Sequence, residues 1–272
     1  MPESLLHQDA HFPFGENWAD YAQHINQIRI DWAEESLIRL IGRKAIEGRT
    51  FLDIGSGSGL FSLAALRLGC RSVLAVDIDP KSVETTRGTL QRWAPSDNWS
   101  CRNISVFDLE SARVERFDIV YSWGVLHHTG DMYGALKAAA SRVVPGGLFA
   151  VALYRKTPFC GPWRIEKKLY THSPQWVQSA IQRVYIALYA GRLALQGRRL
   201  RSYVESYHHG RGMNFYHDVH DWLGGYPYES ILPEEMTSFM DKLGFRLTSS
   251  FLRPCLGLFG TGNDEFCFQN HD

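Results

Sequence analysis

The sequence predicts an α/β protein built on a doubly wound, mostly parallel sheet. Short apolar runs alternate with helix-like segments between residues 50 and 154, a glycine-rich turn follows the first run, and polar side chains end several runs. Strands that alternate with helices form parallel sheets, whose ligands bind at the carboxyl ends of the strands. We therefore expect the functional site at that edge.

Periodicity and the Gly and Pro residues at element ends place the individual elements. The expected strands cover residues 50–54, 72–76, 100–105, 117–121, 148–154, 245–252 and 265–268. The expected helices cover residues 17–42, 60–68, 80–92, 132–143 and 233–243, and a helical apolar face recurs within residues 176–188. Seven strands in this arrangement make one sheet.

The 272 residues fit one large domain with an insertion. We expect an N-terminal helical arm over residues 1–49, a ligand-binding core over 50–154, a mainly helical insertion or lid over 155–232, and a final helix and strand pair over 233–272 that completes the core sheet.

Composition points to a cytoplasmic globular protein. The net charge is zero, which gives no general argument for nucleic acid or membrane partners. The five cysteines are scattered without a C-x-x-C pair, as in reduced proteins without a disulfide frame or a zinc site. Residues 1–18 lack the pattern of a signal peptide, and no apolar run approaches the roughly 20 residues of a membrane span.

The most informative motif is the run from Phe51 to Leu60, which contains Gly55, Gly57 and Gly59. Glycines permit positive φ and let a ligand approach backbone N–H groups. A dinucleotide loop would have glycine three positions after Gly57, where Leu60 stands, so a nicotinamide cofactor is disfavoured. Asp53, two residues before Gly55, suits an ammonium group. S-adenosylmethionine has such a group, and we expect the glycine N–H groups near its carboxylate, although a plain strand–helix turn is the alternative.

Acids also follow the next two expected strands. Asp77 can accept hydrogen bonds from both ribose hydroxyls, as in other nucleotide-binding α/β folds. We read Asp79 as the cap of the helix that begins at Pro80. Asp108 can accept a hydrogen bond from an adenine amino group, or it is a solvated turn residue.

A second strong motif runs from Phe117 to Thr129 and contains Ser122, Trp123 and the pair His127-His128. It resembles the fourth-strand motif of class I S-adenosylmethionine-dependent methyltransferases, and residues 143–147 (Val-Val-Pro-Gly-Gly) resemble the turn before their fifth strand. With the glycine loop and Asp77, the resemblance covers residues 50–154. It is nearest to the polyprenyl-hydroxyphenyl methylase and small-molecule O-methyltransferase branch, in which a histidine at the position of His128 is common.

The resemblance implies a Rossmann-like methyltransferase sheet, S-adenosylmethionine as cofactor and S-adenosylhomocysteine as product. An N-terminal helix can fold Trp18 across the cofactor mouth, and simple core packing of Trp18 is the alternative. The expected cofactor-binding residues are Trp18, Asp53, Gly55, Ser56, Gly57, Gly59, Asp77, Ile78, Asp108, Leu109, Ser122 and Trp123.

Histidines are the candidate catalytic residues. Methyl transfer to a hydroxyl is an in-line displacement in which the acceptor loses a proton, and a group that titrates near neutrality can take it. The candidates are His128, His127 and His217, and the alternative for either histidine of the pair is that it packs and bonds to the backbone. Adjacent residues do not readily point at one atom, so at most one of His127 and His128 is the base. A carboxylate acceptor needs no base, and the histidines then orient it.

A third cluster, rich in His and Asp, is expected to form part of the lid, and a hydrogen-bonded structural loop is the alternative. We expect the substrate-binding residues Arg211, Asp218, Asp221 and Tyr226 in or beside it. Arg211 can pair with a carboxylate or phosphate. The His and Asp spacing matches no metal-ligand motif, so no metal is expected.

Residues 155–201 contain ten Lys or Arg residues and one acid. Such a stretch is a solvated face, a docking face for an anionic partner such as a carrier protein, an RNA or a phosphorylated substrate, or an amphipathic helix on a membrane surface. We interpret the chain as a biosynthetic methyltransferase acting on a small-molecule hydroxyl or carboxyl. The alternatives are a methyltransferase for RNA or a carrier-bound substrate, and a cofactor-binding partner protein without turnover.

Overall fold

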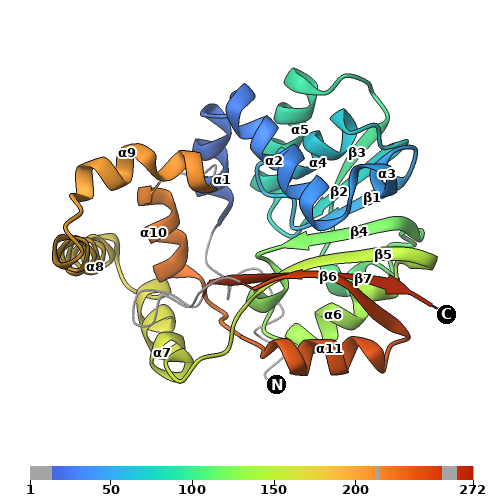
Figure 1. Cartoon of the computed structure of the whole chain (residues 1–272). Coiled ribbons are helices and arrows are strands. Elements are labelled where there is room, and N and C mark those ends of the chain that lie inside the picture. The colour runs from blue at the N-terminus through green and yellow to red at the C-terminus, as the bar shows by residue number, and fades with distance from the viewer. Residues whose placement is uncertain (1–13, 212–214, 253–261, 272) are drawn as a thin grey trace.

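Figure 1 shows the computed structural model, which describes residues 14–211, 215–252 and 262–271. Within them one sheet has the strand order β3-β2-β1-β4-β5-β7-β6. The strands are β1 (Thr50–Ile54), β2 (Ser72–Asp77), β3 (Trp99–Asn103), β4 (Phe117–Trp123), β5 (Val143–Tyr154), β6 (Phe245–Phe251) and β7 (Asn263–Asn270). Neighbours from β3 to β5 are parallel, whereas β7 is antiparallel to β5 and β6. The predicted mostly parallel, seven-stranded sheet is confirmed.

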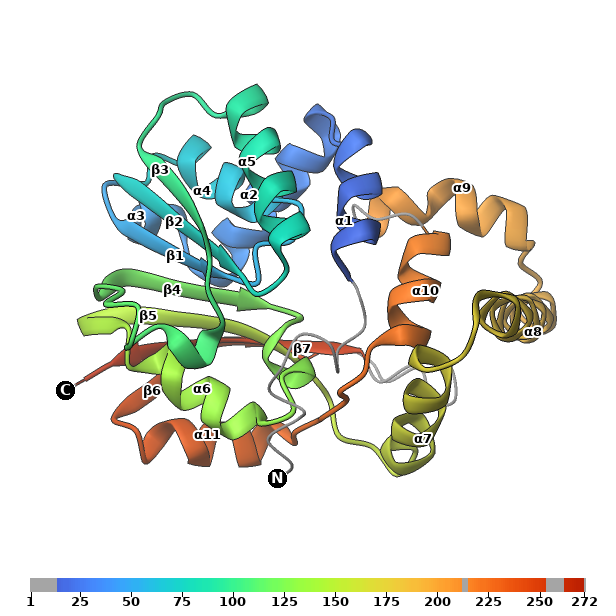
Figure 2. The same ribbon diagram turned by 180° about the vertical axis from the view of Figure 1, so that it is seen from behind.

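Helices cover both faces of the sheet (Figures 1 and 2). On one face lie α2 (Gln27–Leu40), α3 (Arg43–Ile46), α4 (Leu60–Arg67) and α5 (Pro80–Trp93), and on the other lie α6 (Met132–Ala140) and α11 (Pro233–Asp241). Successive strand residues point to opposite faces. Phe51 therefore packs in the core beneath α4, whereas Leu52 packs in the core beneath α6.

The N-terminal arm differs from the prediction. The single helix expected over residues 17–42 is wrong, because α1 (Phe14–Gln23) and α2 are separate helices. The side chain of Asn26 accepts a hydrogen bond from the Arg29 N–H group, 3.1 Å away, and caps α2. Asparagine stabilises a helix start far better than a helix interior, which explains the break.

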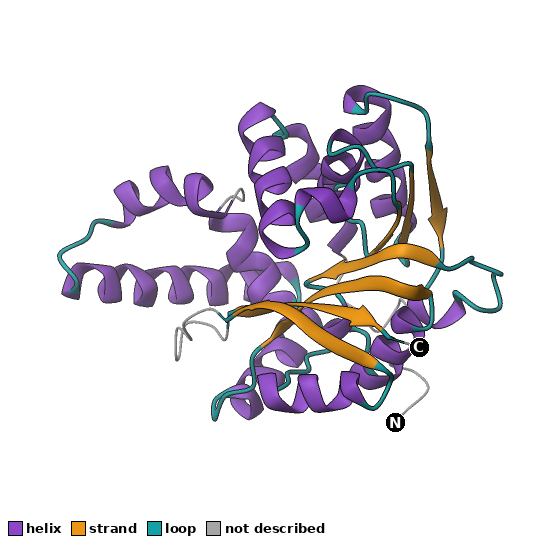
Figure 3. Cartoon of the chain, turned by 45° about the vertical axis from the view of Figure 1, so that its right-hand side comes forward, coloured by secondary structure: helices purple, strands orange, loops and turns teal. Residues whose placement is uncertain are grey.

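After β5 the chain forms α7 (Cys160–Thr171), α8 (Gln175–Leu195), α9 (Leu200–Arg211) and α10 (Phe215–Gly224). These helices extend away from the sheet around their own buried cluster, which includes Tyr170, Tyr189 and Phe215 (Figure 3). At their base, Arg155 makes two hydrogen bonds to Asp264 of β7, at 2.7 and 2.6 Å. This ion pair fixes the start of the helical part to the sheet.

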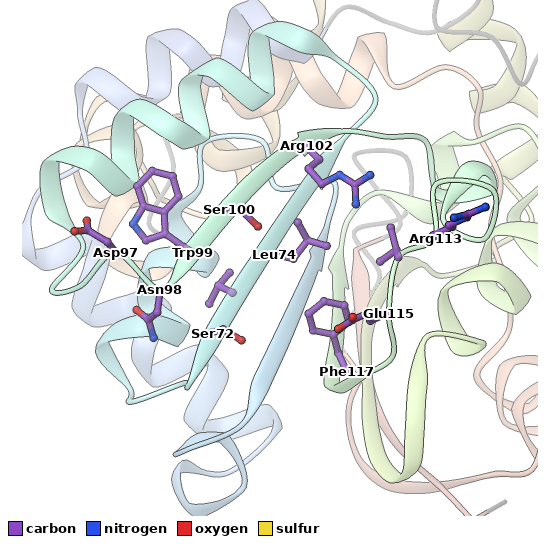
Figure 4. Close-up of a pocket in the computed structure, with 12 residues that line it drawn as sticks. Ser72, Leu74, Asp97, Asn98, Trp99, Ser100, Arg102, Arg113, Glu115 and Phe117 are labelled. Carbon is purple, nitrogen blue, oxygen red and sulfur yellow. The ribbon is translucent and has the colours of Figure 1, made fainter.

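Ligands can approach the sheet at either end of its strands. A groove opens where β2, β3 and β4 begin, lined by Ser72, Trp99 and Phe117 among others (Figure 4). Ligands of doubly wound sheets bind at the carboxyl ends of the strands instead. The glycine loop and Asp77 lie at those carboxyl ends, so the candidate site is there.

Candidate functional site

The glycine loop after β1 lies beside the end of β2, because Ile54 pairs with Val76 in the sheet. Gly55, Gly57 and Gly59 have φ values of +75°, +54° and +78°. These values belong to the left-handed region, which side chains other than glycine rarely adopt. A Cβ atom on Gly59 would also lie 3.0 Å from the Thr86 Cα atom. The loop therefore requires glycine for its conformation and for its packing on α5.

The glycine N–H groups have acceptors within the protein. Gly55 N–H donates to the Val76 carbonyl at 2.8 Å, and Gly59 N–H donates to the Ser56 carbonyl at 2.8 Å. Gly57 N–H donates to the Asp77 carboxylate at 3.0 Å. The expectation that these N–H groups bind a ligand carboxylate is therefore corrected.

Asp77 is held in place by two backbone groups. Its carboxylate accepts the N–H groups of Gly57 and Asp79, at 3.0 and 2.9 Å. Burial raises the pKa of Asp77 to about 6, although these hydrogen bonds oppose the shift. A carboxylate offers about four acceptor positions, so two hydroxyl groups can still bind it. The predicted role of Asp79 as a cap fits its hydrogen bond from Lys81 N–H at 2.9 Å.

Asp53 is buried, with 3% of its surface exposed. The Ser62 hydroxyl, on α4, donates to its carboxylate at 2.6 Å. Burial raises the pKa of Asp53 to about 7, and the charge of Asp77 adds to the shift. The carboxylate lacks a nearby positive charge among these partners, and an ammonium group would supply one.

Helix α1 covers the glycine loop. The indole ring of Trp18 lies over Gly57, so close that a Cβ atom there would lie 3.0 Å from the ring. Tyr21 packs edge-on against Trp18, with 5.8 Å between ring centroids. Gly15 N–H donates to Asp79 at 3.0 Å and fixes the start of α1 on the edge of the sheet. This arrangement agrees with the expected position of Trp18.

The other expected cofactor residues differ in exposure and partners. Ile78 is half-buried beside Asp77, Asp108 is exposed, and Leu109 is buried in the core. The Ser56 hydroxyl lies 3.0 Å from the Thr86 hydroxyl. The Ser122 hydroxyl donates to the Ile54 carbonyl at 3.0 Å. The Trp123 ring stacks on Phe61 and its N–H group bonds Glu265 at 3.4 Å, so this side chain supports the core face beneath α4.

His127 and His128 form a short 3-10 turn after β4, with 4.3 Å between their ring centroids. Nδ1 of His128 lies 2.7 Å from the Pro227 carbonyl oxygen. A carbonyl oxygen only accepts, so Nδ1 carries the proton and the neutral ring has its lone pair on Nε2. Gly225 lies against this ring, where a Cβ atom would come within 2.6 Å of it.

His127 has the opposite arrangement. Its Nδ1 accepts a hydrogen bond from Tyr154 N–H at 3.3 Å, so Nε2 carries the proton of the neutral ring. That Nε2 atom is buried and has no hydrogen-bond partner among the described residues. Burial holds the pKa of His127 well below its usual range, and the charges of His128 and Lys167 add to this. His127 is therefore a buried N–H donor at neutral pH.

An aromatic cluster continues from the histidines into the helical part. Tyr154 lies 3.9 Å from His127 and 5.5 Å from Trp222 and Tyr228, measured between ring centroids. Lys167 is fully buried beside it, with Nζ 3.6 Å from the Trp222 ring centroid and a hydrogen bond to the Trp222 carbonyl. Burial lowers the pKa of Lys167 to about 7.

Sequence reasoning missed this cluster. Lys167 belongs to a basic run that was read only as a surface, and nothing local shows that Trp222 covers it. The spacing of Lys167 and Tyr170 on one helix face could have suggested a buried position.

The expected substrate-binding residues are only partly brought together. Asp221 accepts a hydrogen bond from the Asn17 side chain at 2.7 Å, which joins α10 to α1. Asp218 accepts one from the Tyr207 hydroxyl at 2.5 Å, and Tyr226 packs against His172 with 5.9 Å between ring centroids. The side chains of Arg211 and His217 lie outside the described part of the structure. Among the described residues, no group of three His, Cys, Asp or Glu side chains is placed to hold a metal ion.

Residues 52–149 match the family model described as a methyltransferase domain. This stretch contains the glycine loop, Asp77 and both histidines of the turn after β4. The match covers a little over a third of the chain, and it supports the resemblance of this stretch to class I, S-adenosylmethionine-dependent methyltransferases. The resemblance noted in the sequence is confirmed.

Relatives and solved structures agree with this assignment. The chain is 33% identical over 134 residues to a protein named ubiquinone biosynthesis O-methyltransferase from Xanthomonas campestris pv. campestris, covering 49% of this chain and 52% of that protein. A relative of the same name from Methylobacterium is 29% identical over 137 residues, covering 48% of this chain and 53% of that protein. The chain thus spans about half the length of the curated relatives it matches.

Solved methyltransferases share the fold at low sequence identity. Magnesium protoporphyrin IX methyltransferase from Synechocystis PCC 6803, solved with bound SAH, has a TM-score of 0.53 and 13% identity, covering 89% of this chain and 81% of that one. The 1,6-didemethyltoxoflavin-N1-methyltransferase from Burkholderia thailandensis has a TM-score of 0.51 and 16% identity, covering 90% and 79%. At these identities the likeness establishes the fold.

Proposed function

We propose that this chain transfers the methyl group of S-adenosylmethionine to a hydroxyl or carboxyl group of a small molecule. The observation that carries the proposal is Asp77, whose carboxylate is fixed against the glycine loop at the carboxyl ends of β1 and β2. The relatives named as O-methyltransferases support oxygen as the methylated atom.

The residues at this edge fit the cofactor. S-adenosylmethionine supplies an electrophilic methyl carbon bonded to a positively charged sulfur. We assign Asp77 to the two ribose hydroxyls. The buried Asp53 gains a favourable partner in the ammonium group, because a nearby positive charge stabilises its ionised form. Trp18 on α1 excludes water from the same space.

The two histidines would have different roles. His128 would take the proton of a hydroxyl acceptor at Nε2, because its Nδ1 atom is bonded to Pro227. His127 would donate its buried Nε2–H group to the acceptor oxygen and hold it in line. A carboxylate acceptor needs no base, and then both histidines orient it.

The acceptor would lie between the histidines and the helical part, which would act as the lid. Tyr154, Trp222 and Tyr228 would contact a flat apolar body there, and Asp221 would help to close the lid through Asn17. We keep Asp218, Tyr226 and Arg211 as candidate substrate contacts and His217 as a second candidate base.

Isothermal titration calorimetry tests the cofactor site. S-adenosylmethionine and S-adenosylhomocysteine should bind, and NAD should not. Asp77→Ala should weaken binding by about 1–3 kcal/mol, roughly 5- to 150-fold, since it removes hydrogen bonds to a charged group. Asp97→Asn, an exposed acid at the opposite edge of the sheet, is the control and should leave affinity unchanged.

Turnover separates the proposal from its alternatives. Production of S-adenosylhomocysteine is measured with a panel of hydroxyl- and carboxyl-bearing small molecules. Unchanged affinity in Asp77→Ala would remove that residue from the cofactor site. Cofactor binding with no turnover on any acceptor would indicate a partner protein without catalysis.

A further inference from the structure

The outer face of α8 exposes large apolar side chains along its whole length. Trp176, Val184, Leu188 and Leu195 are 75%, 60%, 62% and 92% exposed. With about 100° of rotation per residue, they fall within an arc of about 120° on the helix surface. We call these four residues the α8 apolar stripe. Single exposed apolar residues are ordinary, whereas a continuous stripe marks an interaction surface.

The rest of α8 shows that the stripe is not part of the fold. The opposite side of the helix carries Tyr189 and Leu193, which are 8% and 3% exposed and pack in the cluster with α9 and α10. The helix is thus held by one face, and α8 lies at the edge of the molecule farthest from the sheet (Figures 1 and 3).

Positive charge surrounds the stripe. Arg183 and Arg192 lie at its two borders, and α8 contains no acid. Before α8, Lys168 is exposed, and after it Arg198 and Arg199 are exposed. Within the described ranges, none of Lys168, Arg183 and Arg199 has an ion pair. This face of α8 therefore complements a partner surface that has an anionic outer layer over an apolar interior.

An anionic lipid surface has this combination. An amphipathic helix with basic residues beside its apolar face lies in the interface of a bilayer, with the apolar side chains at the boundary of headgroups and acyl chains. A second copy of the chain would bring two positive faces together, which is unfavourable. RNA would bind the Lys and Arg side chains but would leave the apolar side chains of the stripe exposed to water. None of the described helices is long and apolar enough to span a bilayer, so the contact would be peripheral.

We propose that the α8 apolar stripe docks on an anionic membrane surface, with the flanking Lys and Arg residues at the lipid phosphates. This proposal goes beyond methyl transfer and does not depend on it, because it uses no residue of the cofactor site.

Co-sedimentation with lipid vesicles tests the proposal on the full chain. Binding to mixed phosphatidylcholine–phosphatidylglycerol vesicles should exceed binding to phosphatidylcholine vesicles and should weaken with added salt. Leu188→Glu should abolish binding, whereas Ile28→Glu, on α2 and 58% exposed, should bind as the wild type does. Arg183→Ala should weaken binding about fivefold, as expected for one basic residue near the surface. Lipids brominated on their acyl chains should quench tryptophan fluorescence less in Trp176→Phe.

Three results would overturn the proposal: no binding to the mixed vesicles, equal binding to both vesicle types, or equal loss in Ile28→Glu and Leu188→Glu. A dimer seen by light scattering and broken by Leu188→Glu would assign the stripe to a second copy instead. Circular dichroism and cofactor titration of each variant confirm that the chain is folded. Cofactor affinity should stay at the wild-type value in Leu188→Glu even if vesicle binding is lost.

Discussion

In two adjacent histidines, a single hydrogen bond determines which ring nitrogen carries the proton. His128 and His127 have the same side chain, yet the Pro227 carbonyl makes Nε2 of His128 the acceptor and Tyr154 N–H makes Nε2 of His127 the donor. Both partners are distant in the sequence, one of them 99 residues away. The sequence therefore predicts a histidine beside the site, but it cannot predict which ring nitrogen of either histidine carries the proton.

The two histidines should respond differently to substitution. With a hydroxyl acceptor that supports turnover, His128→Ala should lower kcat by about 100-fold or more and remove the pH-rate limb that reports protonation of the base. His127→Ala should lower kcat while keeping that limb, because the lowered pKa of His127 leaves its ring neutral across the working range. Initial rates of S-adenosylhomocysteine release measure both effects. If His127→Ala removed the limb and His128→Ala kept it, the roles would be reversed.

At the scale of elements, the loop between β1 and α4 depends on one crowded contact. Gly57 has φ of +54°, and its missing side chain leaves the space that the Trp18 ring of α1 covers. Its N–H group also fixes Asp77. Direct contacts therefore link the loop to both α1 and Asp77.

Gly57→Ala should weaken cofactor binding at least about tenfold, because the new methyl group meets both the Trp18 ring and an unfavourable backbone conformation. Gly88→Ala is the control, since Gly88 lies within α5 with no atom within 4 Å of its Cβ position. It should keep wild-type affinity and gain about 0.5–1 kcal/mol of stability. Calorimetry and thermal unfolding measure the two quantities. Equal affinity in the two variants would exclude a tight contact at Gly57.

Elements with local signals were predicted well, and those with distant partners were not. β1 begins and ends where predicted, because its apolar run is bounded by polar residues and glycine. Asp79 and Pro80 likewise mark the start of α5. The break before α2 was missed because Asn26 can occupy a helix or cap one, and the burial of Lys167 was missed because Trp222 lies 55 residues away.

For the whole molecule, the buried acids at the functional edge lie in three separate parts of the fold. Asp53 is in the core, Asp77 is at the end of β2, and Asp221 on α10 is bonded to Asn17 of α1. Burial is the main cause that raises their pKa values, to about 7, 6 and 8. Burial disfavours the ionised forms of these acids, and a cationic ligand beside them would stabilise those forms.

This charge pattern should make the ligand-free protein less stable as pH rises. A carboxyl group with a raised pKa in the folded state stabilises folding only while it is protonated, so its contribution is lost as pH rises through that pKa. For Asp53 this loss of stability takes place between pH 3.8, the usual pKa of the carboxyl group, and about pH 7, its raised pKa. Near pH 3.8, Asp53→Asn should therefore have the same free energy of unfolding as the wild type. As pH rises to about 7, the variant should become increasingly more stable than the wild type, because the amide never ionises. Urea unfolding across this range measures the difference, with Asp97→Asn as the control. If the difference in unfolding free energy between the two proteins were the same at all pH values, Asp53 would not be the titrating group. If S-adenosylmethionine restored the stability that the wild type loses at higher pH, the positive charge of the cofactor would be shown to stabilise the fold.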